Sequence, residues 1–248
     1  MSKDKKDNTQ YSALFSGVIG QEYDMLKLIC PLAPEMSRLV GLAVKEYSAQ
    51  LNRPVSVVEL GGGTGITTLS ILLASKELSV VSVDNESTMQ SQAQTSLNDW
   101  VTEGRLSFSA DDALTALQGV KNNSVDMVAS AYTLHNFHHD YRKKVYQEIY
   151  RVLKPGGQFI NGDRYGLDDI SKHTEIIQHE VAGYFRVLSK LNKLDVLEHW
   201  IIHLFNDESE NHVMRESVAL QQLKSAGFTE ITLSKRQQVN ALVTAIKS

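Results

Sequence analysis

A short apolar segment that runs straight into a cluster of glycines is the feature that most restricts what this chain can fold into. Residues 55–60 are rich in Val and Leu, which favours a buried β-strand. Gly61, Gly63 and Gly65 follow at alternate positions, and residues 66–74 have the continuous apolar character of a buried helix. A strand that turns sharply into a helix directs free backbone N–H groups and the positive end of the helix dipole at the turn. The sequence therefore predicts an α/β protein that binds an anionic ligand group at this turn.

The spacing of these glycines distinguishes between two kinds of nucleotide site. The dinucleotide fingerprint requires a third glycine three positions after the second, and this chain has Ile66 there. What the chain carries is an acidic residue followed by alternating glycines: Glu59, Gly61, Gly63 and Gly65. This pattern resembles motif I of the class I S-adenosylmethionine-dependent methyltransferases. The resemblance implies that these four residues bind S-adenosylmethionine as cofactor, with S-adenosylhomocysteine as the product.

An acidic residue at the end of the second predicted strand supports the same interpretation. Residues 78–83 form a Val-rich segment that ends at Asp84, about 20 residues after the glycine turn, which places a carboxylate to accept both ribose hydroxyls. The alternative is a helix N-cap, because polar residues follow. We expect Asp84 and Asn85 to contact the cofactor. Met89, in a helix predicted at residues 86–101, would pack on the adenine or in the core.

Two later positions extend the resemblance. Where the family has a Gly-Asp-Ala triplet that reaches the adenine amino group, this chain has Asp111, Asp112 and Ala113. Asp112 and Ala113 therefore match the family, whereas the first position departs from glycine. A helix cap is the alternative role for Asp112. Ser130 lies near the end of the fourth predicted strand, residues 125–131, and is the last predicted cofactor contact.

The resemblance implies a doubly wound α/β fold whose mostly parallel, seven-stranded sheet has the order 3-2-1-4-5-7-6. A helix-ending turn at residues 153–157, ahead of a strand predicted at 158–163, is a further hallmark of the family. Strands predicted at 229–234 and 239–246 are separated by so few residues that they are expected to form an antiparallel hairpin.

The domain organisation follows from the same alignment of motifs. We expect a disordered tail at residues 1–10 and a single methyltransferase domain over residues 11–248. By resemblance, residues 11–50 form an N-terminal helical segment in which Tyr23 contacts the cofactor. Residues 164–215 carry two apolar helical patterns, which predict a helical lid at the carboxyl ends of the strands, over the acceptor pocket.

The composition of the chain limits which binding partners and which cellular compartment we expect. The chain has 248 residues and a net charge of −4, which argues against a broad nucleic-acid surface. Cys30 is the only cysteine, so neither an intrachain disulfide nor a multi-cysteine zinc site can form. The N-terminus lacks the apolar core of a signal peptide, and no apolar segment approaches the roughly 20 residues that cross a bilayer. We expect a cytoplasmic protein with no membrane or nucleic-acid partner.

The segment after the fourth strand holds the best candidates for catalysis. In the family it lies beside the transferred methyl group, and here it contains Tyr132, His135 and Asn136. Imidazole titrates close to neutral pH, so His135 is a candidate general base; the alternative is that it shapes or packs the pocket. Tyr132 and Asn136 are candidates to orient an acceptor, whereas His138 and His139 are expected to begin the next helix and face solvent.

One further pattern, four acidic and histidine residues at helical spacing, could indicate a metal site. Asp195, His199, His203 and Asp207 recur at every fourth position, so they form one stripe on a helix. A pair of His residues at this spacing can bind a metal ion, but a solvent-facing polar stripe is the commoner cause, and no metal is predicted.

The function predicted from these residues is transfer of a methyl group from S-adenosylmethionine to a small molecule, by in-line displacement. The apolar lid segment favours an aromatic or partly hydrophobic acceptor. Two alternatives are an RNA methyltransferase, such as one acting on tRNA, and a protein of this fold that binds S-adenosylmethionine without transferring the methyl group.

Overall fold

The fold is built on one seven-stranded sheet in the order β3-β2-β1-β4-β5-β7-β6, the order predicted from the sequence. The computed structural model describes residues 27, 30–51 and 53–248, so the predicted tail at 1–10 and Tyr23 lie outside the described residues. The strands are β1 (Val55–Leu60), β2 (Leu78–Val83), β3 (Leu106–Ser109), β4 (Val125–Ala131), β5 (Leu153–Arg164), β6 (Thr229–Gln237) and β7 (Asn240–Ile246). Strands β1 to β5 run parallel, and β7 pairs antiparallel with both β5 and β6.

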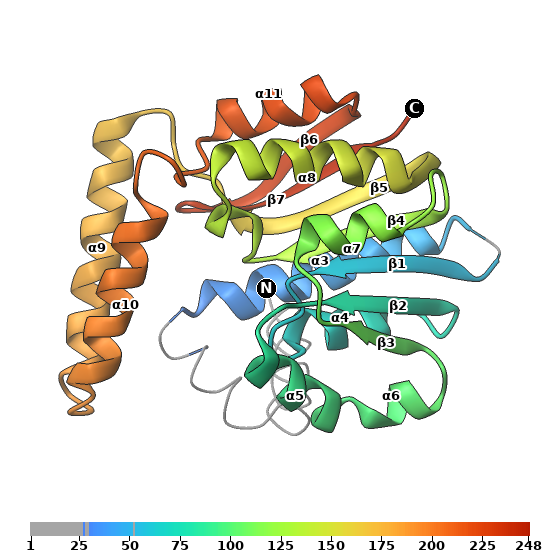
Figure 1. The fold of residues 1–248 in the computed structure, drawn as a ribbon. Helices are drawn as coiled ribbons and strands as arrows, with labels where there is room; N and C mark the ends of the chain where they lie inside the picture. Colours follow the sequence, from blue (N-terminus) through green and yellow to red (C-terminus); the bar gives the residue numbers. More distant parts are fainter. Residues whose placement is uncertain (1–26, 28–29, 52) are drawn as a thin grey trace, which may run out of the picture.

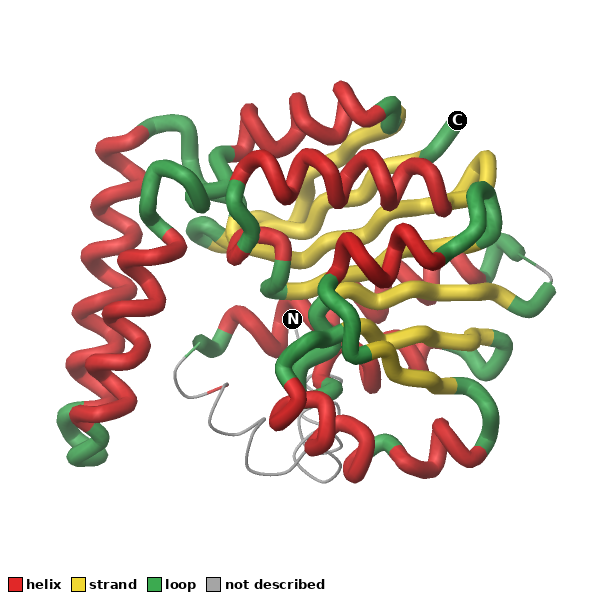
Figure 2. Tube along the Cα trace, viewed as in Figure 1, coloured by secondary structure: helices red, strands yellow, loops and turns green. Residues whose placement is uncertain are grey.

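Helices cover both faces of this sheet (Figure 1). In the described part of the chain they are α3 (Leu32–Ser48), α4 (Ile66–Ala74), α5 (Ser87–Ser96), α6 (Asn98–Thr102), α7 (Ala113–Gly119), α8 (His139–Val152), α9 (Ile170–Leu188), α10 (Leu194–Asp207) and α11 (Glu216–Ala226), with a short 3-10 helix, η1, at Leu134–Asn136. Figure 2 shows the resulting three layers, with the strands between two sets of helices.

Two apolar clusters hold these layers together. On one face, buried side chains of α3 and α4, such as Met36 and Leu69, pack against the strands. On the other face, α7, α8 and α11 contribute Leu117, Ile149 and Leu223, all without exposed surface. Burial of both faces explains the near-continuous Val, Ile and Leu content of the central strands, because an all-parallel core must be covered on each side.

The carboxyl ends of β1, β4 and β5 meet at one edge of the sheet. Leu60 pairs with Ser130, and Ala131 pairs with Gly162, so the segments that follow these strands lie next to one another. The chain leaves β5 at this edge and forms the α9–α10 helical hairpin, which stands beside the sheet at the left of Figure 1. None of the helices in the described ranges combines the length and the apolar character needed to span a membrane.

Two predicted elements differ most from the structure; among the smaller shifts, β6 runs three residues past its predicted end at 234. The helix predicted at 86–101 is two helices, α5 and α6, because the buried Leu97 between them leaves the helical conformation and packs against Gly65. The turn predicted at 153–157 is instead the first part of β5. There, Gly156 N donates to Lys247 O (2.7 Å) and Lys247 N donates to Gly157 O (2.9 Å), which extends the pairing with the end of the chain.

Candidate functional site

The glycine turn after β1 has the backbone shape that its sequence predicts. Gly61, Gly63 and Gly65 have φ angles of +70°, +52° and +94°, a region that side chains with a Cβ rarely adopt. A Cβ on Gly61 would lie 1.9 Å from Thr133 Oγ1, so the turn packs directly on the segment that follows β4. Among the described residues, a Cβ on Gly63 would meet only the Met89 sulfur, at 4.0 Å, so these residues leave the turn open on that side.

Asp84 braces this turn from the end of β2. Its Oδ2 accepts a hydrogen bond from Gly63 N (2.7 Å), and its Oδ1 accepts one from Glu86 N (2.8 Å). The N-cap of α5 is Glu86, whose side chain accepts from Thr88 N, so the capping alternative for Asp84 is not what the structure shows. Asn85 and Met89 are exposed beside it, on the open side of the turn. The predicted ribose contact of Asp84 would use lone pairs that these two bonds leave free.

Glu59 lies beneath the turn rather than on it. Its side chain is fully buried, and Oε2 accepts from Thr68 Oγ1 (2.6 Å), whereas Oε1 has no partner among the described residues. Burial raises the pKa of Glu59 to about 7, although the Thr68 hydrogen bond opposes this. A direct contact between Glu59 and the cofactor stays a prediction.

The remaining predicted cofactor residues make contacts within the protein close to the turn. Asp112 is the N-cap of α7, and its Oδ1 accepts from Leu114 N (3.0 Å). The hydroxyl of Thr115, which donates to Oδ2, and that of Tyr141, which donates to Oδ1 (2.6 Å), lower the pKa of Asp112 to about 2. Ala113 is buried behind it. Ser130 is also fully buried, and its hydroxyl donates to Leu60 O (3.0 Å), so it joins β4 to β1 rather than lining an open surface. An adenine contact by Asp112 stays a prediction.

These groups fit the bound cofactor that the sequence predicts. The absence of a Cβ on Gly63 leaves room for a ligand to approach the backbone, Asp84 offers a carboxylate at the ribose position, and the unpartnered Glu59 Oε1 can accept a hydrogen bond from behind.

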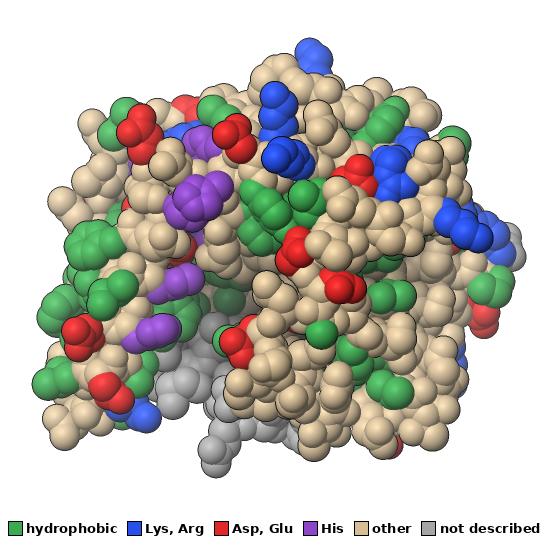
Figure 3. All heavy atoms as spheres, in the orientation of Figure 1, with side chains coloured by type: hydrophobic (Ala, Val, Ile, Leu, Met, Phe, Trp, Pro, Cys, Tyr) green, Lys and Arg blue, Asp and Glu red, His purple; other side chains and the backbone are tan. Residues whose placement is uncertain are grey.

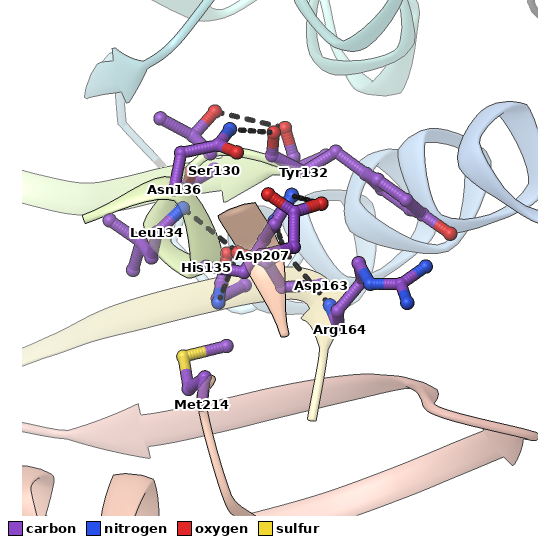
Figure 4. A network of polar contacts seen from close by, with 12 residues as sticks. Ser130, Tyr132, Leu134, His135, Asn136, Asp163, Arg164, Asp207 and Met214 are labelled. Carbon is purple, nitrogen blue, oxygen red and sulfur yellow. Dashed lines mark hydrogen bonds and ion pairs between the residues drawn. The ribbon is translucent and has the colours of Figure 1, made fainter. Parts of the chain in front are cut away.

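His135 is paired with a buried carboxylate that sequence reasoning missed. Its Nδ1 lies 2.5 Å from Asp163 Oδ1, and Asp163 has no exposed surface (Figure 4). Asp163 Oδ2 also accepts from Leu134 N (2.9 Å), and Oδ1 accepts from Arg164 N (2.8 Å). Burial alone would raise the pKa of Asp163, but His135 and these hydrogen bonds hold it below its ordinary value. Since Nδ1 faces Asp163, the other nitrogen, Nε2, is the one available for chemistry.

The backbone around His135 is held in an unusual conformation. Tyr132 has a φ of +51°, and its hydroxyl donates to Asn240 on β7. Strained backbone of this kind persists only where the surrounding structure fixes it, and it concentrates at functional sites. The Asn136 side chain is exposed, and its Nδ2 lies 3.4 Å from Tyr132 O. Figure 4 shows Tyr132, His135 and Asn136 close together at the ends of β4 and β5.

Arg142, a second residue that sequence reasoning missed, clamps this segment from α8. The side chain is fully buried, and it donates to Leu134 O (2.8 Å), Phe137 O (2.6 Å) and His212 O (2.6 Å). A signal for it was present: Arg142 occupies the same helical face as the apolar positions Val145 and Ile149. A charged residue on the buried face of a helix marks a position where the charge has a partner.

Two adjoining cavities lie between His135 and the α9–α10 hairpin. The first, of about 170 Å³, is lined by His135 and by the aromatic side chains of Tyr132, Tyr184 and Trp200. The second, of about 230 Å³, shares Tyr132, Tyr184 and Arg164 with the first. Because aromatic side chains line both, the cavities offer partly apolar walls to a ligand.

A buried ionic network ties the hairpin to β5. Arg164 donates to both oxygens of Glu180 on α9 (2.9 and 3.1 Å) and to Glu208 just after α10 (3.1 Å). Glu208 in turn lies 2.6 Å from His173 Nε2. Burial alone would lower the pKa of Arg164, but the carboxylates keep it well above the ordinary value. The network therefore fixes both helices over the cavities.

The four polar residues predicted to form one stripe on α10 have different surroundings. Asp195 and His199 are exposed, whereas His203 and Asp207 face His135 at the cavity wall. Figure 3 shows histidine side chains along the boundary between this hairpin and the body of the molecule. Of the histidines predicted to face solvent, His138 is exposed, but the Nε2 of the partly buried His139 lies 3.0 Å from Val213 O.

Comparison with known proteins gives two sequence relationships. A family described as "Methyltransferase domain" matches residues 57–157. A demethylmenaquinone methyltransferase of Leptospira interrogans is 34% identical over 120 residues, which cover 48% of this chain and 47% of that protein. This chain thus spans about half the length of that relative. A carboxy-S-adenosyl-L-methionine synthase of Shewanella woodyi is 23% identical over 221 residues, which cover 87% of this chain and 84% of that protein.

A solved structure supports the fold. An O-methyltransferase family protein from Burkholderia thailandensis has a TM-score of 0.63 and 16% identity, covering 92% of this chain and 60% of that one. At this level of identity, the similarity shows the shared architecture and leaves substrate and residue roles to the chemistry of the site.

Proposed function

Because the chain belongs to the class I S-adenosylmethionine-dependent methyltransferase family, we propose that it transfers a methyl group to a small molecule bound beside His135. The observation that carries the proposal is the contact between the glycine turn and the segment after β4. Thr133 packs on Gly61, and His135, two residues on, opens into the aromatic-lined cavity. A cofactor on the turn and an acceptor in the cavity would therefore be neighbours.

For methyl transfer, the protein has to align the methyl donor with the acceptor, exclude water and provide a group that receives the acceptor's proton. S-adenosylmethionine supplies a methyl group already activated on a positively charged sulfur. Tyr132 and Asn136 line the cavity and are placed to orient the acceptor, and the α9–α10 hairpin covers it. His135 Nε2 faces the cavity while Asp163 holds Nδ1, the arrangement in which a carboxylate orients an imidazole and stabilises it once protonated. We assign His135 as the general base and Asp163 as its positioning residue.

The charges around the cavities favour a neutral or cationic acceptor. Arg164 is the cationic side chain in their lining, and Glu180 and Glu208 already neutralise it. Asp207 adds another carboxylate to the wall. A polyanion such as RNA would meet like charges here, which argues against the RNA-methylating alternative.

A second candidate is use of S-adenosylmethionine without methyl transfer. It is favoured by the similarity to carboxy-S-adenosyl-L-methionine synthase, which extends over 87% of this chain. The two candidates differ in product: methyl transfer releases S-adenosylhomocysteine and labels an acceptor, whereas the second reaction modifies the cofactor itself.

The experiment that tests the proposal is incubation with methyl-labelled S-adenosylmethionine and a small-molecule cell extract, followed by identification of the labelled product. We expect S-adenosylhomocysteine and one labelled acceptor. His135→Ala should lower turnover by about 10²- to 10⁴-fold while changing the Kd of the cofactor little. His199→Ala, on the exposed face of α10, is the control and should resemble the unaltered protein. Unchanged turnover in His135→Ala would remove this histidine from the mechanism, and a modified cofactor without labelled acceptor would favour the second candidate.

A further inference from the structure

Three side chains at the junction of the hairpin and the sheet lie closer together than their sequence positions suggest. His135 Nε2 is 3.7 Å from Asp207 Oδ2, and His203 Nε2 is 3.5 Å from the same oxygen. The ligand atoms of all three residues lie within 4.8 Å of one another. These separations are long for direct hydrogen bonds. They are close to the spacing of about 3.3–3.5 Å between ligands on a tetrahedral zinc ion with bonds of about 2.0–2.1 Å.

Asp207 provides an independent indication that a partner belongs here. The residue is 6% exposed, yet its Oδ1 has no hydrogen-bond partner in the described part of the chain. A buried carboxylate is costly unless a cation or several donors satisfy it. His203, one turn earlier on α10, is too far from Asp207 Oδ2 to satisfy that need as a direct donor.

The pairing of His135 with Asp163 fits the same interpretation. A histidine that binds a metal through one ring nitrogen usually donates its other N–H to a carboxylate, which fixes the ring and its tautomer. In this structure Asp163 Oδ1 lies 2.5 Å from Nδ1, and Nε2 points to Asp207 (Figure 4).

We propose that His135, His203 and Asp207 bind one divalent transition-metal ion, with zinc suited best to two imidazoles and one carboxylate. Three protein ligands and an open fourth position are the arrangement of catalytic zinc sites. The open position would face the cavity of about 170 Å³ that these residues line.

The proposal rests on the proposed function and sharpens the role of His135. An acceptor hydroxyl that binds the ion through oxygen would lose its proton to solvent, because a divalent cation lowers the pKa of its oxygen ligands. With the ion bound, His135 would act as a ligand through Nε2 that Asp163 orients; in the metal-free protein His135 would remain the base. The cavity thereby selects acceptors that carry a hydroxyl near an aromatic or apolar body.

The test is a calorimetric titration with Zn²⁺ of chelator-treated full-length protein that carries no histidine tag. We expect one site per chain. His203→Ala and, separately, Asp207→Asn should weaken binding by about 100-fold or more, and Asp163→Asn by about 10- to 100-fold. His199→Ala, one turn away on the same helix and exposed, is the matched control and should bind like the unaltered protein. Co²⁺ in place of Zn²⁺ should give a visible spectrum typical of four-coordinate cobalt that disappears in His203→Ala.

The outcomes separate this site from the methyl-transfer proposal, because the titration needs neither cofactor nor acceptor. No heat with Zn²⁺, or equal affinities for His203→Ala and His199→Ala, would overturn the metal site and leave His135 as the base. Metal binding in a protein that releases no S-adenosylhomocysteine would support the site and overturn the proposed function.

Discussion

The side on which we propose that the cofactor binds (the cofactor side) and the side on which we propose that the acceptor binds (the acceptor side) lie at the same end of the strands but are built in different ways. On the cofactor side, the backbone N–H of Gly63 in the glycine turn donates to the carboxylate of Asp84, 21 positions further along the chain. On the acceptor side, side chains from separate elements meet: His135 and Asp163 are 28 positions apart, and Arg164 and Glu208 are 44 positions apart. A site made of local backbone leaves a spacing pattern in the sequence, whereas a site made of distant side chains does not.

The largest expected effect lies on the acceptor side. Asp163→Asn removes the charge that orients and stabilises His135, so kcat should fall by about 10²- to 10⁴-fold. The Kd of S-adenosylmethionine should stay within about threefold, because Asp163 makes no contact with the glycine turn. Steady-state kinetics and calorimetry on the same preparation measure both quantities.

A purely structural role for Asp163 would give a different result. In that case kcat, KM and cofactor affinity would change together, along with the melting temperature. Asp168→Asn, which alters an exposed carboxylate bonded to Ser217, is the matched control.

The next effect in size concerns the backbone of the cofactor side. Gly61→Ala places a Cβ at φ +70° and against Thr133, so the free energy of unfolding should fall by about 2–4 kcal/mol. Affinity for S-adenosylmethionine should also fall, since the turn must shift. Gly119→Ala is the control because a Cβ there meets no atom of the described part of the chain within 4 Å. Chemical denaturation and calorimetry of the two variants would decide the matter; similar values for both would show that the turn tolerates side chains.

The smallest effect is a pH dependence that Glu59 imparts to stability. Its pKa is about 7 in the folded protein and 4.5 ordinarily, so the folded state holds a proton that the unfolded state releases between these values. Stability should therefore fall as pH rises from about 4.5 to 7 and change little from this source above 7. Relative to Glu59→Gln, the unaltered protein should lose about 2 kcal/mol between pH 5 and pH 8.

Urea unfolding of both proteins at these two pH values checks this prediction. Glu77→Gln, an exposed carboxylate before β2, serves as the control and should leave the pH dependence of the unaltered protein in place. Parallel pH profiles for Glu59→Gln and the unaltered protein would mean that Glu59 stays ionised while buried.

Much of the cofactor side was predictable from particular residues. Gly61, Gly63 and Gly65 favoured positive φ angles, and the Val-rich segments at residues 55–60 and 78–83 favoured buried strands, as the structure has them. Asp84 was placed correctly at the strand end, where its carboxylate meets the turn. The two boundary errors, at Leu97 and at residues 153–157, arose where tertiary packing overrode a local pattern: Leu97 packs against Gly65, and Gly156 pairs with Lys247.

The sequence by itself determined the individual strands and the glycine turn, because periodicity and glycine spacing act through backbone geometry over short stretches. The strand order and the cofactor class followed from the family resemblance that the spacing of Glu59, the glycines and Asp84 carries. Only the tertiary structure brought Asp163 and Asp207 to His135, and only it buried Arg142 and Arg164 in their networks. The physical reason is that electrostatic and hydrogen-bond partners are chosen by distance in space. For the acceptor side, that distance depends on how β5 and the α9–α10 hairpin pack against the segment after β4.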